Sequence, residues 1–301
     1  MTVFTVKHVT TYRYRRPVAI GEHQMMFRPR DSYDQRLIES GLLIVPTPAE
    51  VTWLHDVFGN CVARAAFKGR TNELRFESNI RVEHFTSDAP NFQTLPDAKK
   101  YPFLYDPDEL PDLAPTIARC TADINGEVGR WARQFLSPAK STPTGKLLMT
   151  MTRAIRESFT YVQRPEAGTQ LPETTLLLRR GTCRDFALLM IEAVRTLGLA
   201  ARFVSGYIYV PPREDDTHVG GGSTHAWCEV YLPGAGWVEF DPTNGIIGNR
   251  DLIRVAVARD PGQAIPLFGS YIGAPEDDLG MTVDVQVMSD EVLERRNQLA
   301  S

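Results

Sequence analysis

The sequence predicts an α+β protein in which an antiparallel β domain precedes a domain of helices followed by strands. Three patterns support this fold class. Runs of β-branched and alternating residues dominate positions 1–95, prolines cluster just after them, and a helical stretch near 182–198 leads into strand-like segments. We therefore expect a β domain over 1–95, a Pro-rich linker with a helix over 96–140, and a second domain over 141–290.

The expected β domain consists of several short strands. Residues 74–77 and 80–83 alternate between apolar and polar side chains with period two, as strands do. Residues 51–54 and 61–63 flank Gly59 and Asn60, a pair that suits a tight turn. These two segments are therefore expected to form a hairpin.

The rest of the chain predicts helices first and strands afterwards. Apolar residues recur at helical spacing in the middle of the chain, and Gly198 has the position of a helix-terminating glycine. The expected helices cover 116–135, 143–159, 174–180 and 182–197, and the expected strands cover 203–210, 226–232, 237–240 and 281–287.

Composition excludes several classes of function. The 301 residues carry a net charge of −4, and no basic stripe indicates a nucleic-acid partner. No segment approaches the roughly 18 apolar residues of a membrane span, and the N-terminus has no secretory pattern, so a cytoplasmic location without membrane contact is expected. The four cysteines form no C-x-x-C pair, so we expect neither disulfides nor a metal site, and no cofactor.

Cys183 is the candidate nucleophile because it lies in G-T-C-R-D-F-A, where a helix is expected to begin. The free N–H groups and the macrodipole at a helix N-terminus favour a thiolate, and they can also bind the oxyanion of an acyl-transfer intermediate. Thr182 and Asp185 have the spacing of a capping box. For Cys61, Cys120 and Cys228 the simpler interpretation of a small buried side chain is preferred.

His225 and Asp241 are the candidate partners of this thiol. His225 opens the segment H-A-W-C-E-V-Y-L, and an imidazole can hold the proton that leaves a thiol near neutral pH. Asp241 ends G-W-V-E-F-D-P, where it could orient the imidazole. A turn-rich Pro-Gly-Ala-Gly link joins the two segments, so a hairpin would bring both residues to one end of a sheet.

His225 and Asp241 can meet only if this hairpin has a suitable register. The simplest pairing places Leu232 opposite Trp237. Cys228 then lies opposite Asp241, and His225 points to the other face of the sheet. An odd register shift or a bulge in the Gly-rich turn is therefore required to bring the imidazole and the carboxylate together.

These motifs together resemble the transglutaminase-like superfamily, and more narrowly the bacterial proteins described as cysteine proteases. The motifs are G-T-C-R-D-F-A, T-H-A-W-C-E-V-Y and G-W-V-E-F-D-P-T-N, in the order Cys, His, Asp, together with A-R-F-V-S-G-Y at 201–207. The segments H-V-T-T-Y-R-Y, M-F-R-P-R and H-D-V-F-G-N before position 61 resemble the β domain that precedes the catalytic domain in that bacterial family.

The resemblance implies a papain/transglutaminase-like catalytic domain that acts on a peptide, protein or other amide through an acyl-enzyme. It implies Cys183 as nucleophile, His225 as base and Asp241 as its orienter, and it suggests Tyr161 as an oxyanion donor beside the Cys183 N–H, with core packing as the alternative for Tyr161. Hydrolysis and transfer to an amine both remain open. No calcium site of the animal kind is recognisable.

Two further interpretations remain beside the enzyme. One is a non-catalytic protein-interaction module that retains the fold, although all three triad residues are present. The other is a metal site made of Cys183, His218, His225 and Cys228, whose irregular spacing argues against it. The Gly-rich segment 211–223 is expected to cover the cleft. The sequence indicates no oligomeric state.

Overall fold

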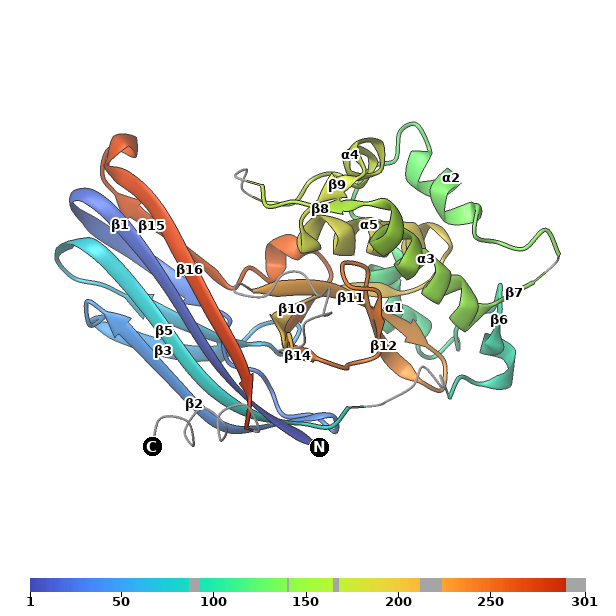
Figure 1. Cartoon of the computed structure of the whole chain (residues 1–301), viewed down its shortest axis with the longest axis horizontal. Helices are drawn as coiled ribbons and strands as arrows, with labels where there is room; N and C mark the ends of the chain where they lie inside the picture. The colour runs from blue at the N-terminus through green and yellow to red at the C-terminus, as the bar shows by residue number, and fades with distance from the viewer. Residues whose placement is uncertain (87–92, 140, 165–167, 212–223, 291–301) are drawn as a thin grey trace.

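Two antiparallel sheets and a group of helices make up the protein (Figure 1). The computed structural model describes residues 1–86, 93–139, 141–164, 168–211 and 224–290. The second sheet lies between the first sheet and the helices (Figure 1). The predicted α+β class, with an N-terminal antiparallel sheet, is confirmed.

The first sheet has seven strands in the order β2-β5-β1-β4-β3, with β15 and β16 also paired to β1. Its strands are longer than the sequence analysis expects, because the alternation of buried and exposed side chains continues along them. Strand β1 continues past Pro17 because its register against β5 shifts between Arg13 and Val18, where no ladder bond is needed from the proline. The strands are β1 (Thr2–Met25), β2 (Gln35–Val45), β3 (Glu50–His55), β4 (Cys61–Ala66), β5 (Arg70–His84), β15 (Leu267–Ile272) and β16 (Asp278–Ser289).

The two last strands return to the start of the chain. Strand β16 pairs with β1 from Phe4↔Ser289 to Tyr14↔Asp278, and β15 pairs with the second half of β1. Both strands fall within 141–290, which the sequence analysis assigns to the second domain. The second part of the chain therefore contributes strands to both sheets. The predicted hairpin around Gly59 is confirmed, with β3 and β4 paired from Glu50↔Ala66 to His55↔Cys61.

The second sheet carries the helices on one face. Its order is β13-β12-β11-β10-β14, and α5 packs on β10 and β11 in the largest hydrophobic core. Two short strand pairs, β6–β7 and β8–β9, tie the connecting segments. The strands are β6 (Lys100–Tyr101), β7 (Thr142–Pro143), β8 (Thr160–Tyr161), β9 (Arg180–Gly181), β10 (Ala201–Ile208), β11 (His225–Leu232), β12 (Gly236–Asp241), β13 (Ile246–Ile247) and β14 (Leu252–Ala258). The helices are α1 (Leu110–Ile117), α2 (Glu127–Arg133), α3 (Thr144–Ser158), α4 (Pro172–Leu178) and α5 (Cys183–Thr196).

The single helix predicted over 116–135 is wrong, because only α2 and the end of α1 within that range are helical. The segment between α1 and α2 is not helical, because the buried Glu192 carboxylate accepts the backbone N–H groups of Cys120 and Thr121, each at 3.1 Å. Gly126 then adopts a left-handed φ of 68° before α2 begins. This segment also exposes Cys120, which corrects the expectation of a buried thiol there.

A hydrophobic cluster and an ion network join the two sheets. Phe4, Val82 and Val285 of the first sheet pack against Tyr207 and Ile253 of the second. Beside this cluster, the Arg254 guanidinium bridges Asp34 on one side and Glu229 and Glu239 on the other, at 2.9, 3.3 and 2.9 Å respectively. Because these groups are largely buried, separating the sheets would leave charges without partners.

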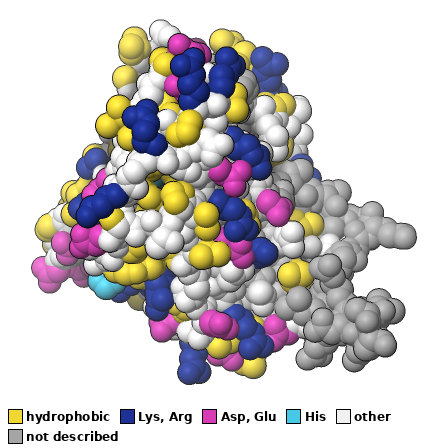
Figure 2. All heavy atoms as spheres, turned by 90° about the vertical axis from the view of Figure 1, so that its left-hand side faces the viewer, with side chains coloured by type: hydrophobic (Ala, Val, Ile, Leu, Met, Phe, Trp, Pro, Cys, Tyr) yellow, Lys and Arg dark blue, Asp and Glu magenta, His cyan; other side chains and the backbone are white. Residues whose placement is uncertain are grey.

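The first sheet shows its outer face in Figure 2, where Lys and Arg side chains lie between hydrophobic ones. Leu43 and Phe268 are examples of the exposed apolar residues of its strands. Interspersed charge of this kind discourages association of sheets. Among the described residues, no helix is both long enough and apolar enough to cross a bilayer.

The buried imidazole of His8 predicts acid sensitivity. His8 bonds to Tyr207 Oη and Thr10 Oγ1, both at 2.9 Å. Burial lowers its pKa from 6.5 to about 4, against a smaller opposite effect of Asp284. Between these two pKa values the unfolded chain binds a proton at His8 that the folded chain does not bind. The neutral His8 therefore contributes about 3 kcal/mol to stability above pH ~6.5, and this contribution is lost as the pH falls toward ~4.

We expect His8→Asn to lower the melting temperature at neutral pH and to flatten its fall between about pH 6.5 and 4. His55→Asn, at an exposed residue of β3, is the control and should leave that slope unchanged. Thermal unfolding followed by circular dichroism across this range measures both slopes. Equal slopes for wild type and His8→Asn would contradict the prediction.

Candidate active site

Cys183 is the first residue of α5, as predicted. Thr182 is the N-cap, its Oγ1 accepts the Asp185 N–H, and the Asp185 carboxylate accepts the Thr182 N–H at 2.8 Å, so the capping box is confirmed. By helix geometry the N–H groups of Cys183 and Arg184 have no acceptor within the helix. The local sequence thus fixes the thiol beside free backbone donors and at the positive end of a 14-residue helix.

The Asp185 carboxylate is fully buried, and hydrogen-bond donors compensate its charge. Arg164 donates to its two carboxylate oxygens at 2.8 and 3.0 Å, and the Gln170 N–H donates at 2.6 Å. Burial alone would raise the pKa of Asp185, but these donors and the Thr182 N–H lower it below its usual value. The carboxylate is therefore held as an anion by its own partners, and its charge is balanced by Arg164.

The thiol is less accessible than a helix start suggests. Cys183 is 6% exposed and belongs to the core beneath α5. A thiol at a helix start is expected to be exposed, and this expectation is wrong here because α5 packs its first turn as well as its middle against neighbouring elements. Cys228 is buried, as expected, with its thiol directed to the Phe240 carbonyl.

The hairpin of β11 and β12 has the shifted register that the hypothesis requires. Leu232 pairs with Gly236 and Cys228 with Phe240, one residue from the simplest pairing. Gly236 adopts a φ of 73°, which a residue with a β-carbon rarely adopts, so the turn closes over three residues instead of four. Position 227 then lies opposite Asp241, and His225, two residues away, shares its face.

His225 and Asp241 form a buried pair at this end of the sheet. His225 Nε2 lies 2.9 Å from Asp241 Oδ2, and both residues are 1% exposed or less. Among the described residues, His225 Nδ1 has no hydrogen-bond partner. Burial lowers the pKa of His225, but the Asp241 carboxylate and the Cys183 side chain outweigh it and raise this pKa well above its ordinary value. Cys183 is among the groups that raise this pKa, so its side chain lies within electrostatic reach of the ring.

The Asp241 carboxylate is itself held by the following loop. Thr243 N–H donates to Oδ1 at 2.8 Å, and Asn244 Nδ2 donates to Oδ2 at 2.8 Å. Burial would raise the pKa of Asp241, yet the His225 cation and these donors lower it. The carboxylate therefore stays charged and keeps a fixed orientation toward the imidazole.

Tyr161 lies close to the same centre. Strand β8 pairs in parallel with β9, with Tyr161 opposite Gly181, two residues before the thiol. Burial raises the pKa of Tyr161 to about 12, and Cys183, Asp185 and Asp241 add to the effect. Its phenol is therefore a neutral O–H donor in the neighbourhood of Cys183.

Two residues near the imidazole were not singled out from the sequence. Asn244 bonds Asp241, and Trp227 stacks on His225 with ring centroids 5.9 Å apart. The position of Trp227 beside the imidazole could have been predicted from the sequence, since it is two positions from His225 on the same strand face. Asn244 followed Asp241 in the quoted D-P-T-N motif, but a side chain in a turn gives no signal of where it points.

The described residues form no metal-binding cluster. Across residues 1–86, 93–139, 141–164, 168–211 and 224–290, no group of three or more His, Cys, Asp or Glu side chains could bind a metal ion. His218, a member of the proposed metal set, lies outside the described residues. The expected cleft-covering segment 211–223 also lies outside them, apart from residue 211.

Two family models match most of the chain. The profile of the bacterial transglutaminase-like N-terminal region matches residues 4–83, and that of the transglutaminase-like superfamily matches residues 130–242, which include Cys183, His225 and Asp241. An uncharacterised protein of Mycobacterium tuberculosis is 30% identical over 293 residues, covering 94% of this chain and 92% of its own. The chain belongs to the bacterial branch of the transglutaminase-like superfamily.

Two further relatives are more distant. A protein-glutamine gamma-glutamyltransferase of Pseudomonas aeruginosa is 30% identical over 119 residues, which is 38% of this chain and 18% of that protein. The solved structure of a candidate cysteine protease from Cytophaga hutchinsonii superposes with a TM-score of 0.67 at 20% identity, over 96% of this chain and 91% of that one. This superposition shows the same fold in both sheets and the helical layer.

We expect Asp185→Asn to destabilise the protein by about 3 kcal/mol, because it leaves the Arg164 cation without its buried partner. Glu127→Gln removes one side of the exposed Glu127–Arg130 pair and should cost less than about 1 kcal/mol. Denaturant unfolding of both variants measures the difference. Similar losses in the two variants would show that the Asp185 network is not structurally important.

We expect Asp241→Asn to lower the pKa of His225, because the carboxylate that raises it is removed while burial remains. The imidazolium should then lose its proton at a lower pH than in the wild type. Nuclear magnetic resonance titration of the histidine ring measures this pKa directly. Asp260→Asn, at a residue that caps a surface turn, is the control. An unchanged His225 pKa in Asp241→Asn would contradict the pairing.

Proposed function

We propose that the protein is a thiol-dependent amide hydrolase or acyltransferase with Cys183 as nucleophile, His225 as general base and acid, and Asp241 as its orienter. One observation carries the proposal. His225 uses Nε2 for the Asp241 carboxylate, its Nδ1 has no hydrogen-bond partner among the described residues, and Cys183 is near enough to raise the pKa of the ring. The nitrogen that a thiol proton needs is thus available.

The reaction would proceed in two halves. The Cys183 proton moves to His225 Nδ1, the sulfur attacks the carbonyl carbon of an amide, and a tetrahedral oxyanion forms. The C–N bond then breaks, the leaving amine takes the proton from His225, and a thioester remains on Cys183. Water or a second amine, deprotonated by His225, attacks this thioester and releases an acid or a new amide.

The oxyanion would be bound at the start of α5. The Cys183 N–H is the first donor, since the helix does not use it. The Tyr161 hydroxyl is the second candidate, because its pKa of about 12 keeps the proton that a donor needs. A neutral donor adds no charge that would repel or neutralise the thiolate.

The relative named protein-glutamine gamma-glutamyltransferase supports transfer to an amine as one outcome of the second half. The triad residues are the same for transfer and for hydrolysis, and a peptide or protein amide is the proposed substrate for both. The cytoplasmic location expected from the N-terminal sequence stays a prediction.

A non-catalytic interaction module is the second candidate function. The observation that favours it is the 6% exposure of Cys183, which leaves little surface for a substrate carbonyl to approach. The two functions differ in the reactivity of this thiol, since only the enzyme needs an imidazole that assists its ionisation.

Alkylation by iodoacetamide distinguishes the two functions. We expect Cys183 to be labelled at about pH 6 faster than the exposed Cys120, which serves as an internal reference within the same chain, because an imidazolium stabilises the thiolate. His225→Ala should slow labelling of Cys183 by roughly tenfold or more and leave Cys120 unchanged. Peptide mass spectrometry locates each label. Labelling of Cys183 no faster than Cys120 at every pH would favour the non-catalytic module.

A further inference from the structure

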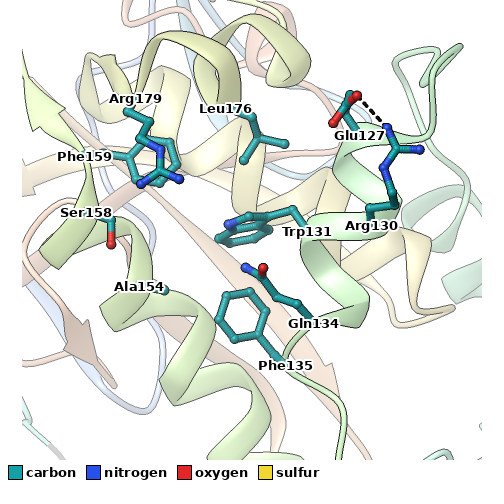
Figure 3. A pocket seen from close by; sticks show the side chains of 10 residues that line it. All are labelled: Glu127, Arg130, Trp131, Gln134, Phe135, Ala154, Ser158, Phe159, Leu176 and Arg179. Atoms are coloured by element: carbon teal, nitrogen blue, oxygen red, sulfur yellow. Dashed lines mark hydrogen bonds and ion pairs between the residues drawn. The ribbon is translucent and has the colours of Figure 1, made fainter.

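A pocket of about 380 Å³ lies among α2, α3 and α4 (Figure 3), a volume within the range of small-ligand sites. It contains none of the three proposed triad residues. Half of its lining residues are apolar, among them Trp131, Phe135, Phe159 and Leu176, and the other half are polar or charged, among them Arg130 and Arg179.

The apolar part of the pocket is built from fixed rings. Trp131 and Phe135 are in edge-to-face contact with centroids 4.9 Å apart, and both side chains project from the end of α2 toward the pocket (Figure 3). Phe159 is anchored from behind by Phe186 of α5, with centroids 5.8 Å apart. Leu176 closes the side formed by α4. Rings that are already held in place can bind an apolar group with little loss of conformational entropy.

The pocket is lined by two arginines, of which Arg130 has an acidic partner and Arg179 has none among the described residues. Arg130 is paired with Glu127 and also donates to the Asn125 carbonyl at 2.8 Å. Arg179 is exposed, and in the described part of the chain its guanidinium makes no hydrogen bond or ion pair. Its backbone has a φ of 46° at the end of α4, a position usually taken by glycine. Arg179 occupies this strained backbone position beside aromatic rings, and its planar guanidinium can donate two hydrogen bonds to an anion.

The strand pair β8–β9 connects the pocket lining to the segment that carries the proposed nucleophile. Phe159 is followed by β8 and Arg179 by β9, and the Thr160 N–H donates to the Arg179 carbonyl at 2.9 Å. The next rung joins the Val162 N–H to the Gly181 carbonyl, also at 2.9 Å. Arg179 precedes Cys183 by four residues, so their α-carbons are at most ~14 Å apart. An extended peptide of about four residues spans such a distance.

We propose that this pocket binds an apolar side chain followed by a carboxylate in the peptide substrate, which rests on the proposed amide-cleaving or acyl-transfer function. The apolar side chain packs between Trp131 and Phe159, and the carboxylate accepts two hydrogen bonds from the Arg179 guanidinium. The pocket thereby selects which amide of a peptide lies at Cys183.

Binding is measured by calorimetry with the full chain carrying Cys183→Ala, so that no turnover intervenes. The probes are N-acetyl-Phe-Glu-amide and N-acetyl-Phe-Gln-amide, which differ only in the acid. We expect the Glu peptide to bind about tenfold more tightly, and Arg179→Gln to remove this difference by weakening the Glu peptide alone. Arg180→Gln is the matched control, with the same loss of charge one residue later and outside the pocket lining, and should retain the preference.

Trp131→Leu provides a second test, because it should weaken both peptides similarly while the preference for Glu remains. Melting temperatures confirm that each variant is folded. Equal affinity for the two peptides, no binding of either, or the same effect from Arg179→Gln and Arg180→Gln would each overturn the proposal. Because the binding assay uses a chain without the thiol, failure of Cys183 to react in the wild type would refute the proposed function and leave this binding result unaffected.

Discussion

The register of the β11–β12 hairpin is the constraint on which the candidate site depends. A shift by one residue would turn either His225 or Asp241 to the opposite face, and no side-chain rotation spans a sheet. The register is fixed at the far end of the hairpin, where Gly236 accepts a left-handed φ of 73°. A glycine in a surface turn thus determines whether two buried ionisable groups meet, although it touches neither of them.

Buried carboxylates recur as the devices that hold irregular backbone in place. Asp185 ties the segment before α4 to the start of α5, Glu192 holds the chain between α1 and α2, and Asp241 organises the loop after β12. Each accepts backbone N–H groups that a helix or strand would otherwise have satisfied. The buried charges of the core therefore project from a helix and a strand, and the irregular segments are held by donating their backbone N–H groups to them.

Local patterns predicted most of the elements and indicated the candidate site residues, and long-range contacts decided the rest. The capping box at Thr182 and the turn at Gly59 depend on neighbours within a few positions, so both could be read from the sequence. The need for a shifted hairpin register could also be derived, because side chains alternate along a strand. The break between α1 and α2 could not, since it depends on Glu192, some seventy residues later in the chain. The burial of Cys183 and the exposure of Cys120 depend on packing of the same kind.

The pairing of β1 with β16 has a consequence for the order of events during synthesis. Strand β1 is synthesised long before β16, so its ladder from Phe4↔Ser289 onward is completed only after β16 has been translated. Until then one long edge of β1 lacks its partner, and an unpaired edge is a site for association with other chains. The first sheet therefore stays unfinished while the second sheet and the helices are synthesised, and a ribosome that stalls before β16 would release a chain with an exposed edge rather than a separable second domain.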